Sequence, residues 1–453
     1  MFARVTARPT PPEPPTPSPS RFATLGRALR HRNFRLFFVG QGISLVGTWL
    51  TRVAMSWLVY RLTRSALLLG LVGFAGQIPT FVVAPFAGVL VDRWSRHRVL
   101  VVTQVLAMAQ SALLALFALT GTITVWHVLA LAAFQGCINA FDTPARQAFV
   151  VEMIDAREDL PNAIALNSSM VNVARLLGPS IAGVLVAAVG EGWCFAADAV
   201  SYLAVVASLL AMRVRARPPR RAPAGSVMHE LAVGFRYVAS FAPIRDILLL
   251  LAVVSLTGIP YVVLMPVFAS DVLHGGPHLL GALMAANGLG ALVGVLWLAS
   301  RQSVLGLGRV IVAAGAAFGA ALIGFALGRN VWLMGALLAV AGAGMMIEMA
   351  ASNTLVQTLV DEDKRGRVMS FYTMAFFGMA PFGSLAAGAL GARLGAPITV
   401  VIGGLLTLGA AGLFAAKLPA LRAQIRPIYT RLGILPEVAA ALDQTASVGT
   451  PPD

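Results

Sequence analysis

Long apolar runs recur along the chain, each broken by a short stretch that carries Gly, Pro or Arg. A helix needs about 20 consecutive apolar residues to cross a bilayer. The chain is therefore predicted to be an all-α membrane protein. Runs of that length predict twelve transmembrane helices, at roughly 36–60, 66–91, 99–119, 125–148, 162–189, 193–212, 244–271, 277–300, 308–328, 331–357, 367–391 and 396–416.

The longest stretch between two runs divides the spans into two groups of six. It starts with five arginines and then places Leu231, Phe235, Val238 and Phe241 at helical spacing, which predicts a short amphipathic helix on the membrane surface. Weak repeats, such as Leu69-Gly70 and Leu280-Gly281, indicate that the two groups are copies. The predicted parts are a disordered Pro/Arg-rich tail (1–33), an N-terminal bundle (34–212), a basic linker (213–243), a C-terminal bundle (244–417) and a C-terminal tail (418–453).

The composition excludes a soluble domain. Hydrophobic residues make up 58% of the chain and charged residues 12%, whereas a soluble domain has about 45–50% apolar and about 25% charged residues. The two cysteines, Cys137 and Cys194, both lie in apolar runs, so they cannot form a secreted disulfide framework.

The net charge of +15 comes from 34 basic and 19 acidic residues. Basic residues gather in the cytoplasmic loops of membrane proteins and contact anionic lipid, so no nucleic-acid partner is expected. With twelve spans, 28 basic residues fall on the side of the N-terminus. The opposite loops hold four: Arg61, Arg64, Arg329 and Arg393. This asymmetry predicts a multi-pass protein of the inner or plasma membrane with both termini in the cytoplasm.

Motifs for several enzyme classes are absent from the sequence. The two lysines, Lys364 and Lys417, both lack the preceding Gly of a phosphate-binding Gly-x-x-x-x-Gly-Lys-Ser/Thr loop. No His-Glu-x-x-His, Cys-x-x-Cys or Gly-x-Ser-x-Gly occurs either. We therefore expect no enzyme, no catalytic residue, no metal site and no cofactor.

The segment between the second and third spans carries Gly88, Asp92, Arg93 and Arg96. It resembles the signature loop of the major facilitator superfamily, Gly-x-x-x-Asp-Arg-x-Gly-Arg-Arg/Lys, with Ser95 in place of the second Gly. Gly88 permits close helix approach, Asp92 can accept hydrogen bonds from a helix N-terminus, and the arginines can pair across the gap between the halves. The resemblance implies the major facilitator fold and a latch that stabilises its outward-facing state.

Further stretches narrow this resemblance to the drug:proton antiporter branch, which includes the enterobactin exporter and macrolide efflux proteins. They include Phe141-Asp142-Thr143-Pro144-Ala145-Arg146 and the partial antiporter kink of Gly178, Pro179 and Gly183. The branch implies secondary active export of a drug, macrolide or siderophore-like molecule, driven by a proton gradient through alternating access. Two alternatives remain. The chain could be an importer or metabolite facilitator on the same fold, or a membrane scaffold or sensor that does not transport.

One position departs from that branch. Many relatives have Arg-x-x-Gln-Gly on helix four, where this chain has Ala132 before Gln135-Gly136. Arg175 on helix five, three residues before Gly178, is our hypothesis for a substitute.

Polar and ionisable residues inside the spans are expected to line a cavity, because lipid does not tolerate them. Asp142 and Glu348 occupy matching places in the two copies. They form either a proton-responsive pair or two ion pairs, Asp142 with Arg146 and Glu348 with a loop arginine. Asp198 could pair with Arg52. The candidates for substrate and proton contacts are Arg52, Gln77, Gln135, Asn139, Asp142, Arg175, Asp198 and Glu348. The expected partners are lipid, a small organic substrate and protons, and the expected state is a monomer.

Overall fold

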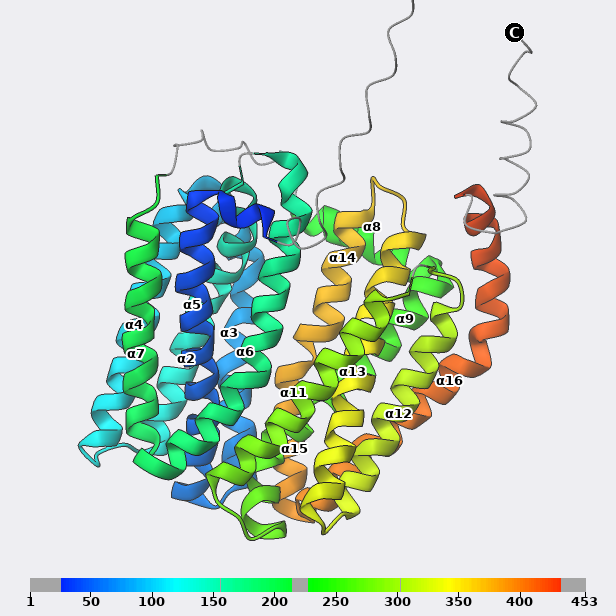
Figure 1. Cartoon of the computed structure of the whole chain (residues 1–453). Coiled ribbons are helices and arrows are strands. Elements are labelled where there is room, and N and C mark those ends of the chain that lie inside the picture. Colours follow the sequence, from blue (N-terminus) through cyan, green and yellow to red (C-terminus); the bar gives the residue numbers. More distant parts are fainter. Residues whose placement is uncertain (1–25, 155, 214–226, 302, 433–453) are drawn as a thin grey trace, which may run out of the picture.

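The computed structural model describes residues 26–154, 156–213, 227–301 and 303–432, and no β-strand occurs in these ranges. Figure 1 shows two helical halves side by side. The first half begins with the short 3-10 helix η1 (Arg27–Arg30). Its long helices are α2 (Arg32–Thr63), α3 (Ala66–Arg93), α4 (Arg96–Leu119), α5 (Val125–Glu152), α6 (Leu160–Val189) and α7 (Glu191–Leu210), with η2 (Arg157–Asp159) before α6.

The second half follows the short helix α8 (Val227–Ser240). Two of its spans are irregular, because interior prolines such as Pro266 remove a backbone donor and π-helical turns interrupt the α-helix. The first irregular span consists of α9 (Ala242–Val253), η3 (Val254–Gly258), α10 (Tyr261–Val267) and η4 (Phe268–Val272), and the second of α14 (Arg365–Thr373), η5 (Met374–Gly378) and α15 (Ala380–Leu394). The remaining spans are α11 (Pro277–Ala299), α12 (Leu307–Leu327), α13 (Val331–Leu359) and α16 (Ala396–Arg431).

Among the described residues, 11 helical segments are long and apolar enough to cross a membrane. The twelfth predicted span is α5, which has 28 residues and is missing from that set. Its apolar run is diluted by Gln135, Asn139 and Asp142, the residues predicted to form a polar face. The twelve-helix, two-bundle prediction therefore agrees with the fold, and the exception is the helix richest in candidate site residues.

Glycine contacts join the halves in two symmetry-related places. A Cβ atom added to Gly183 of α6 would lie 2.8 Å from the Cα of Gly281 on α11, and one added to Gly70 of α3 would lie 2.7 Å from the Cα of Gly388 on α15. Glycines allow helix backbones to approach this closely. In the repeat, Gly183 corresponds to Gly388 and Gly70 to Gly281, so the two crossings are copies of each other.

These contacts gather at one end of the molecule. We call the end that carries both described chain ends, at the top of Figure 1, the terminal end, and the opposite end the far end. The largest apolar cluster extends across both halves and includes Leu69, Tyr261 and Ala387. The cluster around Phe34 and Phe149, at the terminal end of the first half, contains residues of that half alone. The halves are thus joined mainly toward the far end.

The structure differs from the predicted tails at their inner edges. Residues 26–33 are helical rather than disordered, because Arg27 Nε forms an ion pair with Asp159 Oδ1 at 2.9 Å and Ala28 is fully buried. Helix α16 continues to Arg431, well beyond the predicted end at 416, with Leu421 buried. Residues 1–25, 214–226 and 433–453 lie outside the described residues.

Helix α8 packs against the second half. Val238 is buried, Gly234 faces the ring of Phe371, and Phe235 remains 63% exposed. The predicted apolar face is therefore used partly for packing onto α14.

Candidate functional site

Arg52 lies in the middle of α2, one turn after Trp49. Its side chain is exposed, and its guanidinium carbon lies 5.0 Å from the centre of the Trp49 ring. An arginine facing lipid at mid-span is costly. We therefore interpret Arg52 as facing the space between the two halves, which we call the hollow.

Arg175 lies on α6, a neighbour of α2 in the first half, at a place where the helix is locally opened. Pro179 has no N–H to donate to the carbonyl of Arg175 four residues earlier. A Cβ atom added to Gly288 of α11 would lie 3.1 Å from that carbonyl oxygen. The predicted kink of Gly178, Pro179 and Gly183 therefore lies along the contact between α6 and the second half.

Gly178 also sets the distance between α2 and α6. A Cβ atom added there would lie 2.3 Å from the Cβ of Trp49, so any side chain would force the helices apart. This contact sets how close Arg175 of α6 lies to Trp49 and Arg52 of α2.

The charges of Arg52 and Arg175 interact with each other. Among the described residues, neither guanidinium forms an ion pair with a carboxylate. Two like charges thus face the same space without a direct counter-charge.

The predicted pair of Asp198 with Arg52 is wrong. Asp198 is buried on α7, where its carboxylate accepts hydrogen bonds from Thr51 Oγ1 and Ser111 Oγ, both at 2.7 Å. The carboxylate is turned toward these hydroxyls inside the first half, so it acts on Arg52 only as a more distant charge. Asp198 is therefore a packing and hydrogen-bonding group of that half.

Asp142 has a complete set of partners. Its carboxylate forms an ion pair with Arg146 one turn later, and it accepts hydrogen bonds from Thr103 Oγ1 at 3.0 Å and Gln104 Nε2 at 2.7 Å. The expected Asp142–Arg146 ion pair is confirmed. The network joins α5 to α4 inside the first half.

Glu348 occupies the matching place on α13, but its surroundings differ from those of Asp142. Its side chain is fully buried, and neither carboxylate oxygen has a hydrogen-bond partner. The alternative in which it pairs with a loop arginine is wrong, because the side chain faces α12, where its Cγ lies 4.0 Å from the Cβ position of Gly315. Ser352, one turn later, also has a buried hydroxyl without a partner. A buried carboxylate without partners is costly in its charged form.

The neutral candidates lie on α3 and α5. Gln77 is exposed, donates to Gly73 O at 3.0 Å and reaches Ser384 Oγ of the second half at 3.4 Å. Gln135 Nε2 donates to Asn139 Oδ1 at 3.1 Å. Gln77 therefore bridges the halves, whereas Gln135 and Asn139 bond along one helix.

Sequence reasoning missed a polar pair in the second half. Asn287 Nδ2 of α11 donates to the hydroxyl of Tyr261 at 2.5 Å, and the charge of Arg175 reaches Tyr261. The available signal was an isolated amide within a run of small apolar residues. Tyr261 is buried, so the pair forms a polar contact inside the second half, near Arg175.

A second missed cluster closes the far end. Asp271, at the end of η4, accepts a hydrogen bond from the hydroxyl of Tyr60 and lies 3.3 Å from Arg64 Nη1, while Ser270 Oγ accepts from the same Nη1 at 2.7 Å. Tyr60 and Arg64 end α2, so these bonds join the two halves. We call Tyr60, Arg64, Ser270 and Asp271 the far-end gate.

The predicted latch lies at the terminal end of α3 and its following loop. Arg96 Nη1 lies 2.6 Å from Glu152 Oε1 in the same half, and Arg93 is exposed. The side chain of Asp92 lies outside the described residues. A Cβ atom at Gly88 would meet no described atom within 4 Å. Among the described atoms, Gly88 makes no close helix contact in this state, in which the contacts between the halves lie toward the far end.

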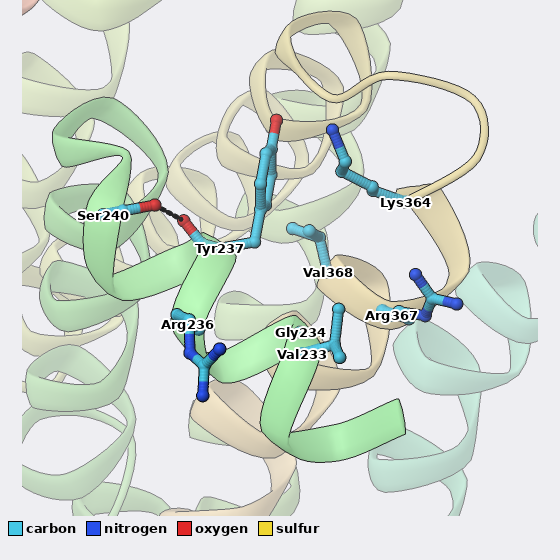
Figure 2. A pocket seen from close by; sticks show the side chains of 8 residues that line it. All are labelled: Val233, Gly234, Arg236, Tyr237, Ser240, Lys364, Arg367 and Val368. Atoms are coloured by element: carbon cyan, nitrogen blue, oxygen red, sulfur yellow. Dashed lines mark hydrogen bonds between the residues drawn. The ribbon is translucent and has the colours of Figure 1, made fainter. Parts of the chain in front are cut away.

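A pocket also lies between α8 and α14, at the terminal end (Figure 2). Its volume is about 280 Å³, and Arg236, Lys364 and Arg367 give it a basic lining. The Nζ of Lys364 lies 4.9 Å from the centre of the Tyr237 ring. This pocket is separate from the hollow between the halves.

The comparison with known proteins agrees with this architecture. The sequence matches the family described as transmembrane secretion effector over residues 23–447. The staphyloferrin A transporter of Staphylococcus aureus is 25% identical over 341 residues, which cover 75% of this chain and 85% of that protein. The enterobactin exporter of Citrobacter koseri is 27% identical over 346 residues, or 76% and 81% of the two chains.

A solved structure of the POT family transporter PepTSo has the same fold, with a TM-score of 0.70 at 13% identity over 87% of this chain and 99% of that chain. This likeness agrees with the two-halved helical fold. The chain belongs to the transmembrane secretion effector family, within the major facilitator superfamily of membrane transporters.

Proposed function

We propose that this protein exports a small organic molecule across the plasma membrane in exchange for protons. The observation that carries the proton part of the proposal is Glu348, a fully buried carboxylate without a hydrogen-bond partner. The two halves would rock about the glycine crossings and expose the hollow to each side in turn. The proton gradient is the energy source, with no cofactor, and the transporting unit is a monomer.

The terminal end is proposed to face the cytoplasm, because the loops there hold most of the basic residues. The far-end gate would then close the outer side. This state would load substrate from the cytoplasm, as an exporter requires.

Glu348 is a better proton site than Asp142 for a physical reason. The ion pair with Arg146 and the bonds from Thr103 and Gln104 stabilise the charged form of Asp142 in place. Nothing comparable stabilises the charged form of Glu348, so its proton affinity depends on whether water reaches it. A change of state that hydrates Glu348 would release its proton, and this links protonation to conformation.

The test is dye uptake into inside-out vesicles with an acidic lumen, using fluorescein and rhodamine 123 as probes. The expected result is uptake of at least one dye that collapses when the gradient is dissipated and in Glu348→Gln. Asp361→Asn is the matched control, because this carboxylate is 43% exposed and pairs with Lys364 at the surface.

Uptake that persists in Glu348→Gln would remove Glu348 from the coupling mechanism. Dye movement only out of these vesicles would favour the importer. The absence of any gradient-dependent flux of either dye would refute proton-driven export of such molecules.

A further inference from the structure

The hollow between the halves carries an excess of positive charge. Arg52 and Arg175 approach it from α2 and α6, and neither forms an ion pair with a carboxylate among the described residues. The Arg52 side chain is exposed and that of Arg175 is partly buried, so both are open to an added molecule. Two like charges close together in a largely apolar membrane protein repel each other, and a bound anion would relieve this repulsion.

The nearby carboxylates do not supply it directly. Asp142 is neutralised by Arg146, and Asp198 is turned toward Thr51 and Ser111. Glu348 faces α12 in the other half. Even if Asp198 acts at a distance on Arg52, one of the two guanidinium charges remains uncompensated.

Aromatic side chains accompany the arginines. Trp49 lies under Arg52, with the guanidinium carbon 5.0 Å from the ring centre. Phe74 and Phe81 of α3 pack edge-on against Phe382 of α15, with ring centres 6.1 and 6.3 Å apart. Phe382 is 42% exposed, and its packing against α3 places it at a contact between the two halves.

We infer that the substrate is an organic anion, with a carboxylate or similar oxyanion group and an aromatic or apolar body. This inference rests on the proposed function and names its substrate class. Guanidinium groups bind carboxylates through paired, charge-assisted hydrogen bonds, and the aromatic side chains supply apolar contact for the remainder of the molecule.

Another role for the arginines would be to tune the proton affinity of an acid. That role requires a carboxylate in contact with the guanidinium, and among the described residues Arg175 forms no ion pair with a carboxylate. The arrangement therefore favours substrate binding over proton coupling for Arg175.

The experiment measures the thermal stability of the purified full-length protein with added probes. Fluorescein, an anion, and rhodamine 123, a cation, share one ring framework, and benzoate and citrate are smaller anions. A ligand that binds only the folded state raises the unfolding temperature, and the rise grows with the logarithm of its concentration once that concentration exceeds Kd. We expect at least one anion to stabilise the parent and rhodamine 123 to have little effect.

We expect Arg52→Gln and Arg175→Gln each to weaken the apparent affinity for that anion by about tenfold to a hundredfold. This is the change that the loss of one charge-assisted hydrogen bond produces. Arg52→Lys keeps the charge and should retain part of the affinity. Arg301→Gln is the matched control, because Arg301 makes the same stacking contact, 5.5 Å from the centre of the Trp297 ring, outside the hollow.

The inference is overturned if no anion stabilises the parent, if rhodamine 123 binds equally well, or if both arginine variants keep the parent affinity. These results are distinguishable from a failure of export. Arginine-dependent anion binding without proton-driven flux would refute export alone, whereas proton-driven flux of rhodamine 123 without anion binding would refute the anion inference alone.

Discussion

Replacing Asp271 by alanine should shift the protein toward a state that is open at the far end. Asp271 is the acceptor through which Tyr60 and Arg64 of the first half contact η4 of the second. Alternating access requires this contact to break in the opposite state, so the substitution removes an interaction present in only one of the two states.

The magnitude follows from the exposure of the partners. A hydrogen bond to a charged group contributes about 1.5–3 kcal/mol, and Tyr60 is only 4% exposed. The Arg64–Asp271 ion pair has side chains that are 66% and 47% exposed, so it contributes about 0–1 kcal/mol. Because Asp271 itself is half-exposed, a total of about 1–3 kcal/mol is expected, which is about a 5- to 150-fold change in the ratio of the two states.

The assay is the distance between spin labels on the two halves. Labels at Thr120 and Arg329 report on the far end, and labels at Arg98 and Arg301 on the terminal end, since all four side chains are exposed. In Asp271→Ala the first distance should lengthen and the second shorten.

The control is Glu191→Ala, which removes a far-end ion pair inside the first half, with Arg61 Nε 2.8 Å from Oε1. That variant should leave both distance distributions as in the parent. If Asp271→Ala also leaves them unchanged, or if Glu191→Ala shifts them equally, the assignment of the far-end gate is refuted.

Two further substitutions test packing and polar contacts by thermal unfolding. Gly178→Ala should lower the free energy of unfolding by about 1–3 kcal/mol, because the new methyl group would overlap Trp49. Gly409→Ala is the control, since it adds a methyl group into open space and should have little effect. Equal effects of the two substitutions would contradict this packing account. Asp198→Asn should lower the free energy of unfolding by about 1.5–3 kcal/mol, because the hydrogen bonds from the hydroxyls of Thr51 and Ser111 become weaker. A loss below about 0.5 kcal/mol would show that the charge of Asp198 contributes nothing to stability.

Features that depend on one helix could be predicted from the sequence. The apolar runs give the spans, and a spacing of four residues places Asp142 and Arg146 on one face of α5. The glycine pair Gly70 and Gly281 was visible as a repeat. Its role became clear only when the fold placed each glycine against a glycine of the other half.

Features that depend on how a helix is rotated, or on which conformational state the protein adopts, could not be predicted from the sequence. Spacing places Asp198 and Arg52 at similar depth, but the rotation of α7 turns the carboxylate toward Ser111. The sequence leaves open whether Glu348 pairs with a loop arginine, and only the packing of α13 on α12 shows that its carboxylate has no partner among the described residues. Asp271 was missed because the end of an apolar run gives no indication of what will pack against it.

The most direct test of proton exchange is to measure proton movement driven by substrate alone. Inside-out vesicles in weakly buffered medium, without an imposed gradient, receive the dye that is active in the uptake assay, and an electrode records the external pH. The account predicts that dye entry drives protons out and acidifies the medium, and that Glu348→Gln abolishes the signal. Dye entry without a pH change, or with alkalinisation of the medium, would contradict it.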